Sequence, residues 1–170
     1  VGAGSLDLTE GELLSWQPPL HDNGSIDALR VTLHDERLGN EVVALITVNI
    51  DAVPYQLLFL EEPGGGYSNT YTALDSRVRI ADRKGATVGG AENVVFYSIA
   101  SGTGTPGASL SGTTIVKALD GVAENNGVMM ELAGTNYRLT ASSLGLVSAT
   151  SSAFDIIGFS STSTQGGGYP

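Results

Sequence analysis

The sequence contains no cysteine, little charge and no long apolar run. Without cysteine, the chain forms no disulfide, no thiolate metal site and no cysteine nucleophile. Charged residues make up 15% of the 170 residues, well below the ~25% typical of soluble domains. No apolar stretch approaches the ~18 residues of a membrane span, and no export signal is recognisable. A weakly charged, Gly-rich chain without disulfides predicts an extracellular or cell-surface protein, prokaryotic or viral rather than animal.

Basic residues and histidine are also scarce. The sequence has 8 Lys and Arg against 18 Asp and Glu, a net charge of −10. A chain this acidic repels phosphate backbones, so we expect no nucleic-acid partner. His21 and His34 are the only histidines, too few for a zinc site without cysteine, and no Gly-x-Ser-x-Gly motif accompanies them. We therefore expect surface histidines and no enzymatic activity.

The sequence instead contains many short segments in which apolar and polar residues alternate. Tyr137, Leu139 and Ala141, for example, alternate with Arg138 and Thr140, which is the period of a half-buried strand. Roughly nine to eleven such segments follow one another at the ~8–12-residue spacing of a sandwich, and no stretch keeps a helical period. The predicted fold is all-β: one or two immunoglobulin-like antiparallel β-sandwiches with little or no helix.

The composition suggests four parts. We expect an N-terminal arm over residues 1–25, an immunoglobulin-like half or domain over 26–90, an immunoglobulin-like domain over 91–157, and a Gly/Ser/Thr-rich tail over 158–170. A join near residues 85–92 gives two small sandwiches. One large sandwich is the alternative, because neither half holds a complete repeat. The composition of the tail by itself predicts disorder.

The first half contains three predicted strands. Residues 26–38 alternate between apolar and polar side chains and form the first, and the β-branched run of residues 41–50 forms the second. Because this second run does not alternate cleanly, we expect a central strand with both faces covered. Residues 55–61 form the third, so that residues 42–60 make a long hairpin.

Four segments in the C-terminal half carry a family resemblance. They are Gly112-Thr113-Thr114, Gly121-Val122-Ala123, the run from Gly134 to Ala141 and the run from Ala149 to Ile156. In this order they resemble the C-terminal half of bacterial immunoglobulin-like repeats, which occur in large secreted and cell-surface proteins. Where such repeats usually place an aromatic residue after Gly-Val-Ala, this chain has Glu124 to Gly127. The resemblance implies a sandwich in which this local hairpin is rebuilt.

The N-terminal half carries a second resemblance. It rests on Asp35, Leu38, Asn40, Leu60, Glu61, Gly66 and Tyr71. These positions resemble the strand-and-turn pattern of immunoglobulin-like repeats in prokaryotic S-layer-type surface proteins, and the segment from Pro63 to Gly66 departs from it by adding flexible glycine. Together the two resemblances imply a module of a large secreted or cell-surface protein.

One glycine motif resembles a phosphate-binding loop in its spacing only. Gly102-x-Gly104-x-x-Gly107 has the spacing of a dinucleotide-binding fingerprint. Pro106 interrupts it, however, and a predicted strand follows, so that no helix N-terminus is available to a phosphate group. We therefore predict a turn here.

Carboxylates are better candidates for holding a cofactor. Asp35, Glu36, Asn40 and Glu41 lie together in one acidic turn. Ca²⁺ takes about six to eight oxygen ligands of this kind, many of them from loop ends. We predict a solvated acidic turn and no cofactor. A calcium site at these four residues is the alternative.

Composition and resemblance together favour a non-enzymatic extracellular structural protein, a subunit or module of a cell-surface assembly or of a filament such as a pilus. Identical subunits would be held by β-strand or arm exchange, in which residues 1–20 or the tail complete the sheet of a neighbour. The alternative is an adhesin or carbohydrate-binding module of a larger secreted protein, with a glycan or surface ligand as partner. A hydrolase that uses the paired carboxylates of Glu61 and Glu62 is a third reading.

Overall fold

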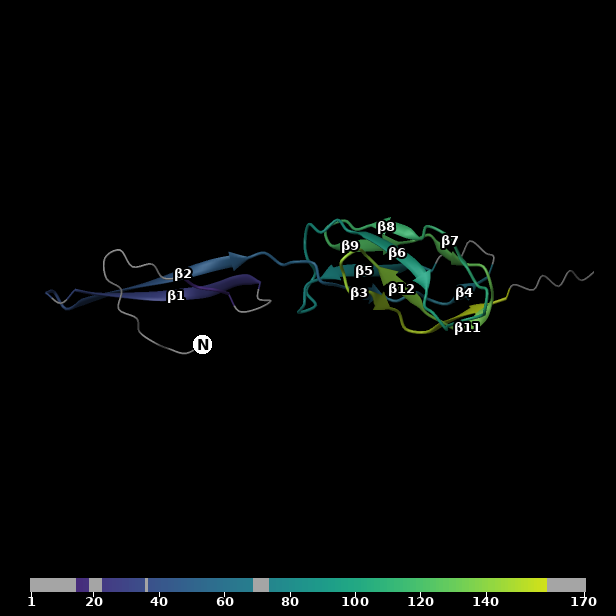
Figure 1. The fold of residues 1–170 in the computed structure, drawn as a ribbon, viewed down its shortest axis with the longest axis horizontal. Coiled ribbons are helices and arrows are strands. Elements are labelled where there is room, and N and C mark those ends of the chain that lie inside the picture. The colour runs from purple at the N-terminus through teal and green to yellow at the C-terminus, as the bar shows by residue number, and fades with distance from the viewer. Residues whose placement is uncertain (1–14, 19–22, 36, 69–73, 159–170) are drawn as a thin grey trace, which may run out of the picture. The chain divides into compact units, whose positions relative to one another are not determined.

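The structure is a computed structural model, and it describes residues 15–18, 23–35, 37–68 and 74–158. Every regular element among these residues is a strand, so the prediction of an all-β fold is confirmed. None of the described residues forms a helix that could cross a membrane. The chain divides into two compact units, residues 1–52 and residues 53–170, and each is described by itself (Figure 1).

The first unit contains a long antiparallel hairpin. Strand β1 covers Gly24–Asp35 and strand β2 covers Asn40–Ile50. In the turn between them, Gly39 has a φ of +68°, a left-handed conformation that glycine adopts without strain. Among the described residues these two strands form a sheet of their own, with no third strand beside them.

A β-bulge at Ala28 decides which side chains of the hairpin share a face. The register shifts between Asp27 and Leu29 and is regular on either side of them. Regular alternation would put Ile26 and Leu29 on opposite faces, and the extra residue returns them to the same face. Apart from Asn40, which the last rung places on the same face opposite Asp35, the described side chains of one face are therefore apolar, and we call these the hairpin face: Ile26, Leu29, Val31, Val42, Ala44, Ile46, Val48 and Ile50.

Two predictions for this region are wrong. β2 is not a central strand with both faces covered, because it has one partner strand among the described residues and Val42 and Ile46 are 59% and 46% exposed. Its pattern looks continuous because Val43 and Leu45 add apolar side chains to the opposite face. Residues 42–60 do not form a hairpin either, since β2 pairs with β1 and residues 51–54 lead from one unit into the next.

The second unit is a single β-sandwich. One sheet has the strand order β3–β5–β9, with bounds Gln56–Glu61, Ser76–Ala81 and Val122–Asn125. The larger sheet has the order β13–β12–β6–β8, with bounds Ala149–Thr150, Leu139–Ser142, Val94–Ile99 and Ile115–Lys117. Figure 1 shows these strands stacked in layers. Smaller sheets have the orders β11–β14–β4 and β10–β7, with bounds Gly134–Tyr137, Phe154–Ile157, Gly66–Tyr67, Val128–Met130 and Leu110–Gly112.

The core of the sandwich comes from the alternating residues of these strands. Val78 and Ile80 on β5, Val95 on β6 and Leu139 on β12 are all 0% exposed, and the residues between them point outward. Full burial of each such side chain contributes about 1.5–3 kcal/mol. In a chain without disulfides, this burial between the sheets is the main stabilising contribution, and the predicted immunoglobulin-like sandwich is confirmed.

Tyr137 closes one end of the core in the manner of a tyrosine corner. Its ring is 0% exposed, stacks on Phe154 at a centroid distance of 6.1 Å, and its hydroxyl donates to the Leu132 carbonyl oxygen at 3.0 Å. A side chain on Gly104 would overlap this ring, and Gly104 has a φ of +68°. The predicted turn at Gly102–Gly107 is therefore confirmed, and its middle glycine makes room for Tyr137.

The chain divides at a different place from the predicted join. Residues 85–92 lie in the connection between β5 and β6, inside the sandwich, where Gly85 and Gly90 have φ values of +87° and +73°. These two glycines form local turns, although the Gly-rich composition of residues 85–92 is also typical of a linker. The predicted arm and tail fall largely on residues that the structure does not describe.

Candidate functional site

The candidate calcium ligands come from the turn that joins β1 to β2. Asp35 and Asn40 are paired across the last rung of the ladder, and Asn40 and Glu41 are exposed. Glu36 and the side chain of Asp35 lie outside the described part of the chain. Among the described residues no group of three His, Cys, Asp or Glu side chains that could hold a metal ion occurs. The calcium site therefore stays the alternative prediction, which calorimetric titration with Ca²⁺ would test.

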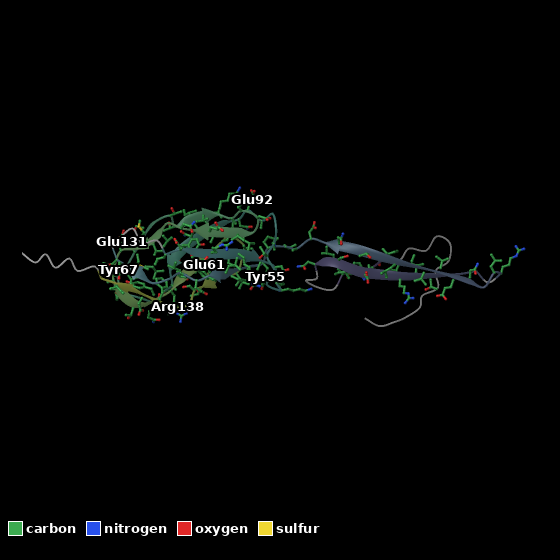
Figure 2. All side chains as sticks on the ribbon, turned by 180° about the vertical axis from the view of Figure 1, so that it is seen from behind. Tyr55, Glu61, Tyr67, Glu92, Glu131 and Arg138 are labelled. Carbon is green, nitrogen blue, oxygen red and sulfur yellow. The ribbon has the colours of Figure 1, made fainter. Side chains whose placement is uncertain are left out.

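Three carboxylates of the sandwich, Glu61, Glu92 and Glu131, lie apart from one another. Figure 2 shows Glu61, Glu92 and Glu131 at separate places on this unit. Glu92 is 2.6 Å from the Lys117 ammonium, and this hydrogen bond and the attraction between the charges hold the pKa of that carboxyl below its usual value. Glu131 accepts from the Ser109 hydroxyl at 2.8 Å. Glu92 and Glu131 are therefore engaged in separate local contacts.

A groove runs along the seam where the two edges of the sandwich meet. At one end the Leu57 amide donates to the Val147 carbonyl oxygen, and the Val147 amide donates to the Tyr55 carbonyl oxygen, both at 2.9 Å. At the other end β4 pairs in parallel with β14. Between these points β3 pairs only with β5, and β13 pairs with β12 in the other sheet. The seam therefore opens, and we call this opening the seam groove.

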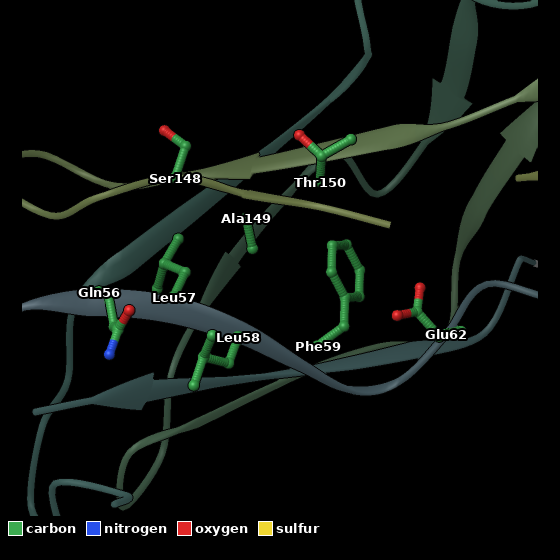
Figure 3. Close-up of a pocket in the computed structure, with 8 residues that line it drawn as sticks. All are labelled: Gln56, Leu57, Leu58, Phe59, Glu62, Ser148, Ala149 and Thr150. Carbon is green, nitrogen blue, oxygen red and sulfur yellow. The ribbon is translucent and has the colours of Figure 1, made fainter. Parts of the chain in front are cut away.

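The seam groove combines an aromatic ring with several polar groups. It has a volume of about 310 Å³ and is lined by Gln56, Leu57, Leu58, Phe59, Glu62, Ser148, Ala149 and Thr150. Figure 3 shows the Phe59 ring rising from β3 toward the strand that carries Ala149 and Thr150. Gln56 and Ser148 lie toward one end of the groove and Glu62 toward the other.

Two of the polar groups are held by hydrogen bonds to the backbone. The Gln56 amide nitrogen donates to the Asp82 carbonyl oxygen at 2.8 Å. The Glu62 carboxylate accepts from the Ser152 amide at 2.9 Å. Both side chains are therefore oriented before any ligand arrives, which lowers the entropy that binding costs.

Sequence reasoning named only one residue of this groove. Glu62 belongs to the proposed hydrolase pair. Its partner Glu61 lies opposite Arg77 on β5 and does not line the groove. Phe59, Ser148 and Thr150 carried no local signal, because the groove joins segments about ninety positions apart through a parallel pairing that alternation does not predict. The hairpin face could not be predicted either, because the bulge at Ala28 interrupts the alternation that would show Ile26 and Leu29 on one face.

The comparisons with known proteins give no family. No family model matches the sequence, and no curated protein matches it. Among solved structures, the chain is similar to a glycosyl hydrolase family 2 member from Bacteroides cellulosilyticus, at 16% identity and a TM-score of 0.47, over 79% of this chain and 18% of that one.

Two further structures show the same level of likeness. One is a β-glucuronidase from Parabacteroides merdae, at 18% identity and a TM-score of 0.39, over 71% of this chain and 15% of that one. The other is a β-glycosidase from Bacteroides vulgatus, at 12% identity and a TM-score of 0.41, over 84% and 24%. The chain thus spans less than a quarter of the length of these proteins, and at such scores the likeness carries no inference about its activity.

Proposed function

We propose that the sandwich is a non-enzymatic binding module of a larger extracellular protein, of the kind that resembles prokaryotic surface repeats, and that the seam groove holds its ligand, a carbohydrate. The observation that carries this proposal is the lining of the groove. It places one aromatic ring beside an amide, a carboxylate and two hydroxyl groups.

This lining suits the chemistry of a sugar. A pyranose ring has an apolar face of C–H bonds, which packs on an aromatic ring such as Phe59, and a rim of hydroxyl groups that both donate and accept hydrogen bonds. Ser148 and Thr150 can do both, and the Glu62 carboxylate can accept. Small-molecule sites usually combine an apolar wall with a few placed polar groups in this way.

The dimensions favour binding of a short glycan segment and not catalysis. A groove of about 310 Å³ lies at the lower end of the ~300–1,000 Å³ of ligand sites, which fits one or two sugar units. Glycoside hydrolysis needs two carboxylates on either side of the scissile bond. Glu62 is the one carboxylate in the described lining, and it already accepts from the Ser152 amide.

A glycan array followed by titration of the bound glycan tests the proposal. Thr150→Ala and Ser148→Ala should each weaken binding about 5-fold or more, because each removes a hydroxyl that donates and accepts. Thr140→Ala is the matched control, since Thr140 pairs with Thr150 across the sheet but does not line the groove. A silent array, or equal losses in the control, would overturn this function.

A second candidate function rests on a different observation. The hairpin face is apolar, and its side chains Val42 and Ile46 are exposed, whereas a two-stranded hairpin on its own is marginally stable in water. This supports the reading as a structural subunit or module of a surface assembly, joined to its neighbour through the hairpin. Light scattering that finds only monomers at high concentration would exclude it.

A further inference from the structure

We propose that the hairpin face packs against the hairpin face of a second copy of this chain, so that two hairpins stack into a two-layered sandwich about a two-fold axis. The inference rests on the second candidate function, assembly through the hairpin, and adds the partner and the geometry to it. Three features of the hairpin lead to this arrangement: its one-sided face, its charge distribution and its size.

The bulge at Ala28 makes the apolar face of the hairpin continuous. Without the bulge at Ala28, Ile26 would lie on the opposite face from Leu29 and Val31. With it, the apolar side chains of β1 lie opposite those of β2, in the pairs Ile26–Val48, Leu29–Ile46 and Val31–Ala44. Alternation of this strictness is typical of a sheet that has one buried face.

The charged side chains that are described within β1 and β2 lie away from this face. Asp27 and Arg30 pair with Thr47 and Leu45 on the opposite face, where Glu41 also falls by alternation. The whole chain carries a net charge of −10, so two copies repel one another wherever charged surfaces meet. The hairpin face is one surface on which two such acidic chains can meet without placing like charges opposite each other.

The size of the face fits a reversible dimer. A strand of 12 residues is about 40 Å long, and a two-stranded ribbon is about 10 Å wide, so each face offers roughly 400–500 Å². Stacking two faces removes on the order of 1,000 Å² in total, at the lower limit for a specific interface. We therefore expect a dimer that forms at micromolar or higher concentration and dissociates on dilution.

Chain connectivity favours a tip-to-base arrangement of the two hairpins. Each β2 ends at Ile50, and the second unit begins at Val53. If the two hairpins ran in the same direction, both sandwiches would begin at the same end of the stack and compete for space. With opposite directions they begin at opposite ends, and Ala44, near the middle of the face, lies close to its own copy.

Sedimentation equilibrium of the whole chain over a wide concentration range tests the proposal. Ile46→Asp puts a charge on the hairpin face and should weaken dimerisation at least 10-fold, because two carboxylates would be buried at the interface. Val43→Asp is the matched control, because Val43 is 45% exposed against 46% for Ile46 but lies on the opposite face. This control should leave the dissociation constant within about 2-fold of the original.

Cross-linking tests the direction of packing. The chain has no cysteine, so Ala44→Cys and Ile50→Cys each introduce a single thiol. A short bis-maleimide should link Ala44→Cys into covalent dimers and leave Ile50→Cys, at the base of the hairpin, as a monomer. Efficient linking of both variants would overturn the tip-to-base arrangement.

The outcomes separate this inference from the function on which it rests. Dimers that Ile46→Asp abolishes and Val43→Asp retains support both. Oligomers that are insensitive to Ile46→Asp, or that are trimers, overturn the two-fold packing of hairpin faces but still agree with assembly as a function. Monomers at every concentration, with hairpin amides protected from hydrogen exchange, overturn both and point to a segment of the same chain as the cover.

Discussion

The hairpin and the sandwich are made of similar strands that differ in what covers them. In the sandwich, Val78 and Ile80 on β5 alternate with outward-pointing residues and are 0% exposed. In the hairpin, Val42 and Ile46 alternate in the same way and are 59% and 46% exposed. Alternation of apolar and polar residues therefore predicts that a strand has one apolar face. Whether that face is buried depends on the rest of the fold.

The two units also differ in how their strands are tied together. The sandwich joins strands that are distant in the sequence, as where β12 pairs with β6 and β4 pairs in parallel with β14. The hairpin contains only one pairing between neighbours in sequence. Stability in the sandwich should therefore be cooperative, while the hairpin depends on whatever covers its face. Substitutions of Tyr137, Asn125, Tyr97 and Ile46, with their controls, test this contrast.

The largest effect is expected at Tyr137. Tyr137→Ala removes a fully buried ring that stacks on Phe154 and should lower the free energy of unfolding of the sandwich by about 3–5 kcal/mol. Tyr137→Phe removes only the hydrogen bond to Leu132 and should cost about 1 kcal/mol. Urea unfolding followed by circular dichroism measures both. Equal costs for the two variants would show that the ring does not hold the core.

The next largest effect is expected at Asn125, a buried polar side chain at the end of β9. It is 0% exposed, donates to the Thr113 carbonyl oxygen at 3.0 Å, and accepts from the amides of Gly127 and Val128 at 3.1 and 3.2 Å. Asn125→Ala leaves these backbone groups without this partner and should cost about 2–3 kcal/mol.

Asn126→Ala is the control for this substitution, since Asn126 is exposed in the same turn and should change stability by less than about 0.5 kcal/mol. Urea unfolding measures both variants. A loss at Asn126 as large as the loss at Asn125 would place the sensitivity in the turn itself and not in the buried amide.

Much of the sandwich could be predicted from the sequence, because its signals are local. Strand β12 lies at Leu139–Ser142, where the alternation of Leu139 and Ala141 with Arg138 and Thr140 predicts a half-buried strand. The seam groove could not be predicted, since it depends on the parallel bridge between Gln56 and Val147. Such pairings between distant segments depend on how the whole sandwich closes, so no local sequence pattern predicts them.

The two strands of the hairpin could be predicted from the sequence, but which of their faces is covered could not. Both strands lie nearly where the sequence predicts them, but the continuous apolar run of β2 predicts burial on both of its faces. The reason is that Val43 and Leu45 occupy the face opposite Val42 and Ile46. A run of apolar residues shows that side chains avoid water on average, and it does not say which face has a partner.

A smaller effect is expected from the ionisation of Tyr97. Burial raises the pKa of its hydroxyl to about 12, above the ~10 of a tyrosine in water. The folded sandwich thus keeps a proton that the unfolded chain releases, so stability is full below about pH 10 and falls as the pH rises toward 12. With an allowance for partial solvent screening, the loss is about 1–2 kcal/mol.

Urea unfolding at about pH 9 and about pH 11.5 measures this loss. Tyr97→Phe lacks the ionisable group and should lose less stability over the same interval, by about the amount assigned to Tyr97. If both proteins lose stability in parallel, other groups cause the alkaline transition and Tyr97 does not differ from an exposed tyrosine.

The smallest effect is expected on the stability of the sandwich when a residue of the hairpin is substituted. Ile46→Asp alters a side chain of the first unit, whose strands pair only with each other among the described residues. The free energy of unfolding of the sandwich, measured by hydrogen exchange at the core amides of β5 and β12, should therefore change by less than about 0.5 kcal/mol. Val43→Asp on the opposite face should be equally silent. A change above about 1 kcal/mol in either variant would mean that hairpin and sandwich unfold as one cooperative body, and the difference between a covered and an uncovered sheet would then lie in packing between the units instead of in a partner from outside.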